Sequence, residues 1–209
     1  IAEYECGYGE KLANFWLHNN FITVDNEKIS KSIGNTYTLD DLAKKGFDPL
    51  DYKMWVLQGQ YHTERNFSFD NLAAAKTRRL NWRNRIAARY QEEQAPPHLE
   101  NPQPAASTLD RNTLLAIASN NLNSAEVLSM IDNSTLSLDD WEFVDQLLGL
   151  DLIKTTPVIS DAALAKILAR ESARESHNYQ KADQLRDELA AENITVLDTP
   201  AGPIWQYLS

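Results

Sequence analysis

Cysteine is almost absent from this chain, because Cys6 is the only one among 209 residues. A single thiol excludes a disulfide within the chain, and it also excludes a zinc site built from several cysteines. This usage fits a reducing, cytosolic setting in which Cys6 serves as a small packing residue.

Long apolar runs are missing as well. The sequence contains no stretch of about 18 apolar residues, which excludes a helix that crosses a membrane. Its start lacks the basic-then-apolar pattern of a secretory signal. We therefore expect a cytoplasmic protein without a membrane partner. Apolar residues make up 43% of the chain, which is enough for a core in one or two domains.

Positive charge is scarce overall but concentrated in one place. The chain has 20 basic and 30 acidic residues, a formal net charge of −10, which argues against a protein that coats nucleic acid indiscriminately. Residues 76–89 nevertheless contain no acid and six bases: Lys76, Arg78, Arg79, Arg83, Arg85 and Arg89. This segment is either a solvated basic face or a helix that binds a polyanion at one defined place.

The strongest chemical motif is a loop at residues 28–35, with the sequence Lys-Ile-Ser-Lys-Ser-Ile-Gly-Asn. Lysine ammonium groups supply positive charge, and serine hydroxyls donate hydrogen bonds. Gly34 allows the backbone to turn without strain at Cβ. The pattern is typical of a loop that holds anionic oxygens, and the alternative is an ordinary solvated lysine loop.

Elements of both kinds are expected around this loop. Residues 15–17 and 21–24 have the composition of strands in a sheet that continues upstream of Ile1. Thr38 with Asp41, Asp48 with Pro49, and Ser68 predict three helix starts, with helices over 38–46, 49–57 and 69–93.

The second half of the chain follows a linker, because Pro96, Pro97, Pro102 and Pro104 forbid helices and sheet ladders. Helices are predicted along the stripe of residues 114–122 and near 124–132, 138–149, 161–176 and 179–192, followed by strands at 194–197 and 204–207. The side chains expected to face inward are Leu114, Ile117, Ala118, Leu122, Leu164, Ile167, Leu168, Leu185 and Leu189.

Together these motifs resemble the cysteinyl-tRNA synthetase family of class I aminoacyl-tRNA synthetases. Residues 28–32 resemble the family's KMSKS loop, with isoleucine in place of methionine. The stretches at 13–19, 32–35 and 66–68 resemble the family's sequence around that loop. At the other end, Ala182-Asp183-x-x-Arg186-Asp187-x-Leu189 and Asp198-Thr199-Pro200-x-Gly202-x-x-Trp205 resemble its C-terminus. The resemblance therefore brackets the whole chain in the family's order.

The resemblance implies an enzyme that activates cysteine with ATP and Mg²⁺ and then transfers it to tRNA(Cys). The ATP-closing loop would comprise Lys28, Ile29, Ser30, Lys31 and Ser32, with Lys31 as the main phosphate contact. Adenylate formation builds negative charge on phosphoryl oxygens, and an ammonium group placed there stabilises the transition state.

Two parts of the family's active site are missing from this sequence. No His-x-Gly-His motif occurs, because His18, His62, His98 and His177 stand far apart. The family's zinc ligands are also absent, and the last of them would lie just before Ile1. The resemblance implies the C-terminal half of the enzyme, inactive by itself, with zinc held elsewhere and no metal ligand in this chain.

The family pattern also suggests which residues bind tRNA. Arg174, Tyr179, Asp183 and Asp198 would read the anticodon, because an aromatic ring stacks on an unstacked base and carboxylates accept from base amino groups. The alternatives are a surface ion pair between Arg174 and Asp183, and a turn cap at Asp198. Three arginines of the basic segment would contact tRNA phosphates without reading sequence: Arg78, Arg79 and Arg83.

The predicted fold class is mainly α. Residues 1–36 would end a Rossmann-type α/β catalytic domain, 37–94 form a helical stem-contact region, 95–107 a linker, 108–176 a helical bundle, and 177–209 a small α/β anticodon-binding segment. We expect a monomer. Two alternatives remain: a truncated paralogue that binds tRNA without catalysis, and a ligase that joins cysteine to an amino sugar, which the anticodon-like tail disfavours.

Overall fold

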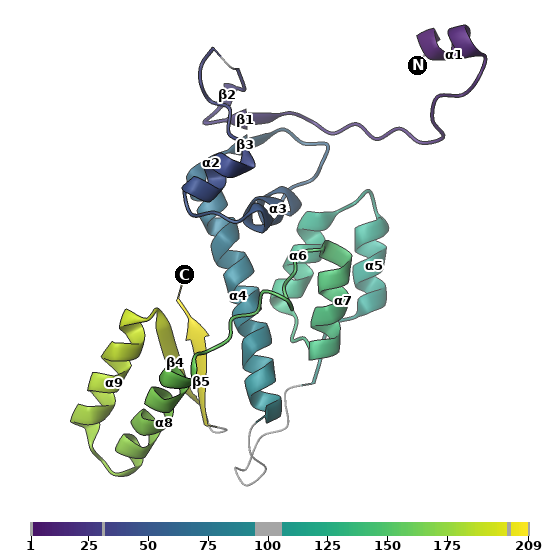
Figure 1. The fold of residues 1–209 in the computed structure, drawn as a ribbon. Coiled ribbons are helices and arrows are strands. Elements are labelled where there is room, and N and C mark those ends of the chain that lie inside the picture. The colour runs from purple at the N-terminus through teal and green to yellow at the C-terminus, as the bar shows by residue number, and fades with distance from the viewer. Residues whose placement is uncertain (1, 31, 95–105, 200–201, 209) are drawn as a thin grey trace.

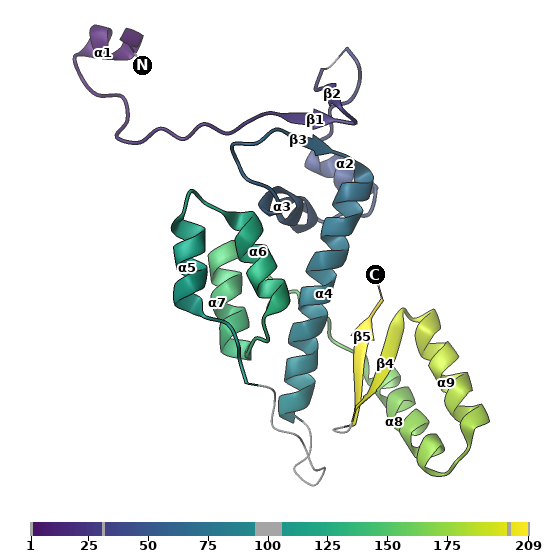
Figure 2. The same ribbon diagram turned by 180° about the vertical axis from the view of Figure 1, so that it is seen from behind.

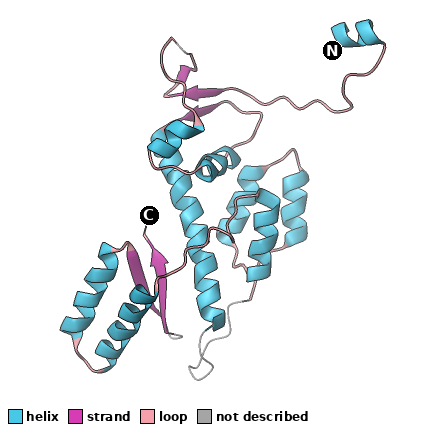
Figure 3. Ribbon diagram, viewed as in Figure 1, coloured by secondary structure: helices cyan, strands magenta, loops and turns pink. Residues whose placement is uncertain are grey.

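The long helix α4 (Phe69–Gln94) is the axis of the molecule. The computed structural model describes residues 2–30, 32–94, 106–199 and 202–208, which are mainly helical with two small sheets, as predicted (Figure 3). Apart from α1, the other elements gather around α4 in three groups: a sheet with two helices at one end, a three-helix bundle on one side, and a helix pair with a hairpin on the other (Figures 1 and 2). No described helix is both long and apolar enough to cross a membrane.

The sheet near the start of α4 has three strands in the order β2-β1-β3. β1 (Ile22–Val24) pairs antiparallel with β2 (Glu27–Lys28) and parallel with β3 (Arg65–Phe67). The turn between β1 and β2 is tight, because Asp25 and Asn26 both have positive φ, 51° and 65°.

The prediction of a strand at residues 15–17 is wrong. These residues lie in an extended connection that leads away to α1 (Ala2–Tyr8), and the side chains of Phe15 and Leu17 are exposed (Figure 1). The expectation that Cys6 packs in a core is also wrong, because Cys6 is exposed on α1. The third strand is instead β3, whose Arg-Asn-Phe sequence carries too little apolar pattern to predict a strand.

The helix starts in this half of the chain are confirmed. α2 (Leu39–Lys44) begins with a capping box between Thr38 and Asp41, and α3 (Pro49–Leu57) begins with one between Asp48 and Asp51. At the start of α4, the Ser68 hydroxyl accepts a hydrogen bond from the backbone N–H of Asn71 at 3.2 Å. These starts depend on contacts within three residues, which is why they are readable from sequence.

The three-helix bundle shares one core with α3 and α4. It consists of α5 (Arg111–Ser119), α6 (Ser124–Asn133) and α7 (Leu138–Leu148), with Trp55, Trp82 and Trp141 among the fully buried side chains. Leu114 is buried as predicted, but Leu122 is exposed. Leu122 lies beyond the end of α5 at φ 52°, so the helical spacing that placed it inward does not extend to it.

The last group has a separate core. It comprises α8 (Asp161–Glu175), α9 (Tyr179–Ala191), β4 (Ile194–Thr199) and β5 (Gly202–Tyr207), and α4 adds one residue to its core, Ala87. The two strands form an antiparallel hairpin. α8 therefore packs with α9 and the hairpin, whereas the sequence suggested a bundle that includes α8 and ends at residue 176.

The inward face of α8 differs from the expected one. Ile167 is buried as predicted, but Leu164 and Leu168 are exposed. The buried positions are instead Ala163, Ile167, Arg170 and Ala173, which share one face at helical spacing. Two alanines and an arginine share this face with Ile167, and Arg170 pairs with Asp198 of β4, a partner that the apolar pattern of α8 alone does not show.

Two side-chain amides of α4 hold β5 against the helix. Asn84 donates to the carbonyl of Tyr207 at 2.7 Å and accepts from its N–H at 3.2 Å. Gln91 makes the same pair of contacts with Trp205, at 3.2 Å and 3.0 Å. The amides replace a neighbouring strand along this edge of β5, so backbone groups that would attract another chain are satisfied.

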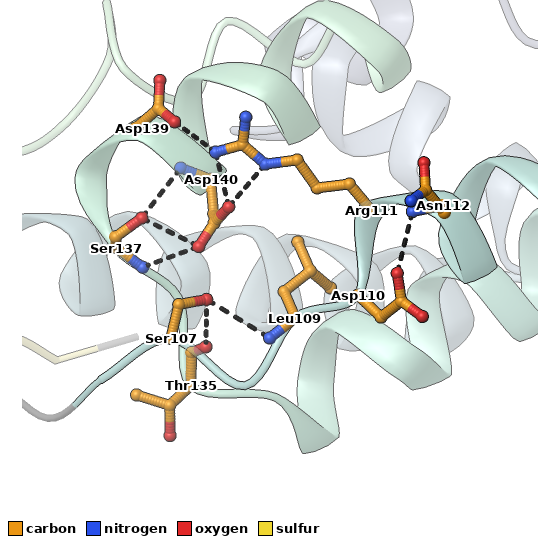
Figure 4. Close-up of polar contacts among 9 residues, drawn as sticks. All are labelled: Ser107, Leu109, Asp110, Arg111, Asn112, Thr135, Ser137, Asp139 and Asp140. Carbon is orange, nitrogen blue, oxygen red and sulfur yellow. Dashed lines mark hydrogen bonds and ion pairs between the residues drawn. The ribbon is translucent and has the colours of Figure 1, made fainter.

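A polar cluster joins the starts of α5 and α7 (Figure 4). The Arg111 guanidinium contacts the carboxylates of Asp139 and Asp140, and Asp140 also forms the capping box of α7 with Ser137 (Figure 4). Burial opposes ionisation of Asp140, but hydrogen bonds from Ser107, Ser137 and Arg111 outweigh it and lower the pKa of this carboxyl.

Replacing Asp140 by asparagine is expected to lower the free energy of unfolding by about 1–3 kcal/mol at pH 7. The pKa of Asp140 is depressed in the folded state relative to about 3.9 in the unfolded chain. Its stabilisation is therefore complete above about pH 5 and is lost as the pH falls through the folded pKa. Urea unfolding at neutral and acidic pH measures this, and a difference between wild type and Asp140→Asn that does not shrink on acidification contradicts it.

Candidate functional site

The lysine-serine loop connects β2 to α2 and is exposed at the end of the molecule away from the hairpin (Figure 1). Lys28 ends β2, and Ile29, Ser30 and Ser32 follow it on the surface. Lys31, the residue predicted to contact phosphate, lies outside the described residues. The hydroxyls of Ser30 and Ser32 are 2.7 Å apart, so one donates to the other and the second retains a free donor.

The base of the loop is closed by the side chain of Asn35. Its Oδ1 accepts from the N–H of Ser30 at 2.8 Å, and its Nδ2 donates to the carbonyl of Lys28 at 3.2 Å. Gly34 has φ +74°, and its N–H and that of Ile33 both donate to the carbonyl of Ser30 at 3.2 Å. The expected glycine turn is confirmed, and the loop has a defined base.

A second asparagine positions the loop from outside it. Asn66 of β3 accepts from the backbone N–H of Asn26 at 2.7 Å and contacts the hydroxyl of Thr23 at 3.3 Å. This contact orients the β1–β2 turn that leads into the loop. A pocket of about 460 Å³ lies beside it, lined mostly by apolar side chains of the sheet, α2 and α3, among them Ile29, Tyr37, Tyr52 and Phe67.

The arginines of α4 are engaged with the protein itself. Arg79 is buried, with 6% of its side chain exposed, and its Nε lies 2.9 Å from Oδ1 of Asp51, whose side chain is 3% exposed. Arg78 pairs with Asp132, to which the indole of Trp82 also donates. With so little of its side chain exposed, Arg79 offers little surface to the tRNA phosphate predicted as its partner.

The remaining arginines of α4 bind backbone carbonyls of neighbouring segments. Arg83 donates to the carbonyl of Thr155, and Arg89 donates to that of Leu136. Arg85 donates to the carbonyls of Ile131 and Ser134 at the end of α6. Residues 76–89 contain no acid, and most partners of their arginines are carbonyls and carboxylates of α3, α6 and the chain around α7. Arg89 also pairs with Glu92, further along α4, at 2.8 Å.

A cleft of about 240 Å³ on the C-terminal group brings together all four residues predicted to read an anticodon. Arg174 comes from α8, Tyr179 and Asp183 from α9, and Asp198 from β4. The cleft also contains Arg170, Ala182 and Arg186. An exposed aromatic ring next to guanidinium and carboxylate groups offers stacking, donors and acceptors within one small volume.

Asp198 is the electrostatic centre of this cleft. Arg170 binds both of its oxygens, with Nη1–Oδ1 at 2.8 Å and Nη2–Oδ2 at 3.0 Å, and Arg174 also contacts Oδ1. The Arg170 hydrogen bonds, helped by Arg174, lower the pKa of Asp198 against the opposing effect of burial. The same contact raises the pKa of Arg170. Asp198 is therefore held as a carboxylate.

The pairings within the cleft differ from the simple alternatives drawn from sequence. Arg174 pairs with Asp198, and Asp183 lies 3.3 Å from Arg186 on its own helix. Asp198 bridges β4 to α8, so its role extends beyond its own turn. Sequence reasoning did not identify Arg170, although its position four residues before Arg174 places both arginines on one face of α8.

No metal centre accompanies these features. Among the described residues, no group of three or more histidine, cysteine, aspartate or glutamate side chains is arranged to hold a metal ion.

The N-terminal part of the chain is similar to a known catalytic domain. Residues 1–77 match the family model described as tRNA synthetases class I (C) catalytic domain. This match includes the lysine-serine loop, Asn35, and the strands β1, β2 and β3 of the adjoining sheet.

Curated relatives match the chain along nearly its whole length. The cysteine–tRNA ligase of Solibacter usitatus (strain Ellin6076) is 34% identical, over 99% of this chain and 48% of the relative. The cysteine–tRNA ligases of Campylobacter lari and Thermosynechococcus vestitus are 31% and 30% identical, over 98% and 97% of this chain and 49% and 47% of the relatives. The chain thus spans about half the length of the curated relatives it matches.

Proposed function

The chain belongs to the cysteinyl-tRNA synthetase family, and on this premise we propose that its protein activates cysteine with ATP and transfers it to tRNA(Cys). Within that reaction the chain supplies two parts: a loop that closes over the ATP phosphates, and a cleft that binds the anticodon. The observation that carries the second part is the convergence of Arg174, Tyr179, Asp183 and Asp198 in one cleft.

The ATP role rests on the composition and geometry of the loop. Lys28 and Lys31 provide positive charge, and the Ser30–Ser32 hydroxyl pair provides a donor at the tip. The contacts of Asn35 with residues 28 and 30 hold the base of the loop in place. A preorganised base next to two lysines in the sequence suits a loop that meets negative charge as it develops at the α-phosphate and pyrophosphate.

The tRNA role rests on the chemistry of the cleft. Tyr179 is exposed and can stack on an unpaired base, while Arg174 retains N–H groups that are not used on Asp198. Asp183 is exposed on the rim and offers a second carboxylate. Arg78 and Arg83 of α4 are half-buried, and phosphate contacts by their exposed parts would add affinity without sequence preference.

Replacing Arg174 and Asp198 together by alanine is expected to weaken binding of tRNA(Cys) by at least about tenfold, because specific base contacts contribute about 1–3 kcal/mol each. Fluorescence anisotropy with labelled tRNA measures the affinity. Wild-type binding is expected to fall linearly with the logarithm of salt concentration, as phosphate contacts require.

The matched control is Lys166→Ala. Lys166 is another cation on α8 that reaches α9, with its Nζ 2.7 Å from Glu192, but it does not line the cleft. This variant is expected to bind tRNA(Cys) like the wild type. Equal affinities for the wild type and the double alanine variant would show that the cleft does not bind the anticodon.

A further inference from the structure

Arg170 differs from the other cations of the cleft in its burial. Its side chain is 9% exposed, compared with 38% for Arg174 and 60% for Arg186. It lies on the face of α8 that packs against the hairpin, at the floor of the cleft. A buried guanidinium in this place contacts Asp198 but has little surface to offer to RNA.

The contacts of Asp198 show what Arg170 does to the cleft. Oδ1 receives Nη1 of Arg170 and Nη1 of Arg174, and Oδ2 receives Nη2 of Arg170. A carboxylate has about four lone-pair sites, so these three contacts leave about one acceptor, on Oδ2. The planar two-point contact with Arg170 also fixes the plane of the carboxylate, and therefore the direction of that acceptor.

Arg174 depends on the same contact. Its Nη1 contacts Oδ1 of Asp198, and because a guanidinium carries five N–H donors, other donors of Arg174 remain for a bound base. If Arg170 were removed, Arg174 could form the two-point pair with Asp198 itself. That pair would use the donors of Arg174 and reorient the acceptor of Asp198. Neither residue could then form its hydrogen bond with an anticodon base.

We propose that Arg170 is a positioning residue that sets the base specificity of the cleft, acting through Asp198 and Arg174 without contacting RNA. The proposal rests on the anticodon role proposed above. Rejection of a wrong base requires that a polar group of the site be left unpaired, and this in turn requires a fixed direction for each donor and acceptor. Arg170 supplies that fixed direction.

The test measures the ratio of the affinities of one protein for two RNAs. A general loss of folded protein lowers both affinities and leaves this ratio unchanged. The probes are the anticodon stem-loop RNA of tRNA(Cys) and three copies that each carry one replaced anticodon base. Wild type is expected to prefer the unaltered stem-loop. Arg170→Met is expected to lower that preference by about tenfold or more at one or more of the three positions, with a smaller loss of affinity for the altered copies.

Two further variants separate positioning from general stability. Arg170→Lys keeps the charge but not the planar fork, so an intermediate loss of discrimination is expected. It also provides the test if Arg170→Met does not fold. Lys166→Met, which removes the neighbouring α8 cation outside the cleft, is expected to discriminate like the wild type.

The outcomes distinguish this inference from the proposed function. If wild type does not discriminate between the four RNAs, the anticodon role fails and the inference fails with it. If wild type discriminates and the Arg170 variants do so equally well, the inference alone is overturned. In the double variant Arg170→Met/Asp198→Asn, discrimination should be no lower than in the worse single variant; additive losses would indicate that Arg170 contacts RNA directly.

Discussion

Replacing Lys31 by alanine in the whole enzyme is expected to lower the rate of cysteine-dependent ATP–pyrophosphate exchange by about 10²–10³-fold, with little change in ATP affinity. The reason is that the ammonium group meets charge that develops only as pyrophosphate departs, so its effect falls on the transition state more than on bound ATP. Exchange kinetics over a range of ATP concentrations measure both quantities.

The neighbourhood of Lys31 makes this prediction specific. Asn35 closes the base of the loop, and the hydroxyls of Ser30 and Ser32, the sequence neighbours of Lys31, meet at 2.7 Å. Lys44→Ala is the matched control, since Lys44 is an exposed lysine of α2 paired with Asp41 at 3.8 Å. Similar losses of rate and ATP affinity in Lys31→Ala would contradict a role in the transition state.

Replacing Arg79 by methionine is expected to lower the free energy of unfolding by about 3–5 kcal/mol, because it leaves the buried carboxylate of Asp51 without its cation. Asp51 also closes the capping box of α3, accepting from the N–H of Asp48 at 2.9 Å, so it cannot turn toward water without loss of that contact. Urea unfolding followed by tryptophan fluorescence reports on this core, which contains Trp55 and Trp82.

The control for this prediction is an arginine pair on the surface. Arg186 lies 3.3 Å from Asp183, with side-chain exposures of 60% and 63%, and Arg186→Met is expected to change stability by less than about 1 kcal/mol. A similarly small change in Arg79→Met, combined with weaker binding of tRNA, would instead favour the phosphate contact first expected for Arg79.

The helix starts and the hairpin of this protein were predictable because they depend on neighbours in the sequence. The capping boxes at Thr38, Asp48 and Ser137 use groups three residues apart, and each is present in the structure. The family resemblance also came from local strings of residues, and the relatives bear it out. One sequence is therefore sufficient to predict helix starts and to recognise the family.

Contacts between distant segments were not predictable in the same way. The strand β3 exists because it pairs with β1, more than 40 residues before it, and its own three residues carry no strand pattern. The loop at 28–35 was recognised from its composition, but its dependence on Asn66 appears only when the turn and β3 lie side by side.

The sequence by itself determined the family, the lysine-serine loop, the helix starts and the four residues that meet in the cleft. The partners of the arginines became apparent only in the tertiary structure. Those of α4 looked like a free basic face, but their partners are carbonyls and carboxylates far along the chain, such as Asp51 for Arg79. Charge composition does not reveal partners that folding brings from elsewhere, and for the same reason only the folded chain shows Arg170 beneath Asp198.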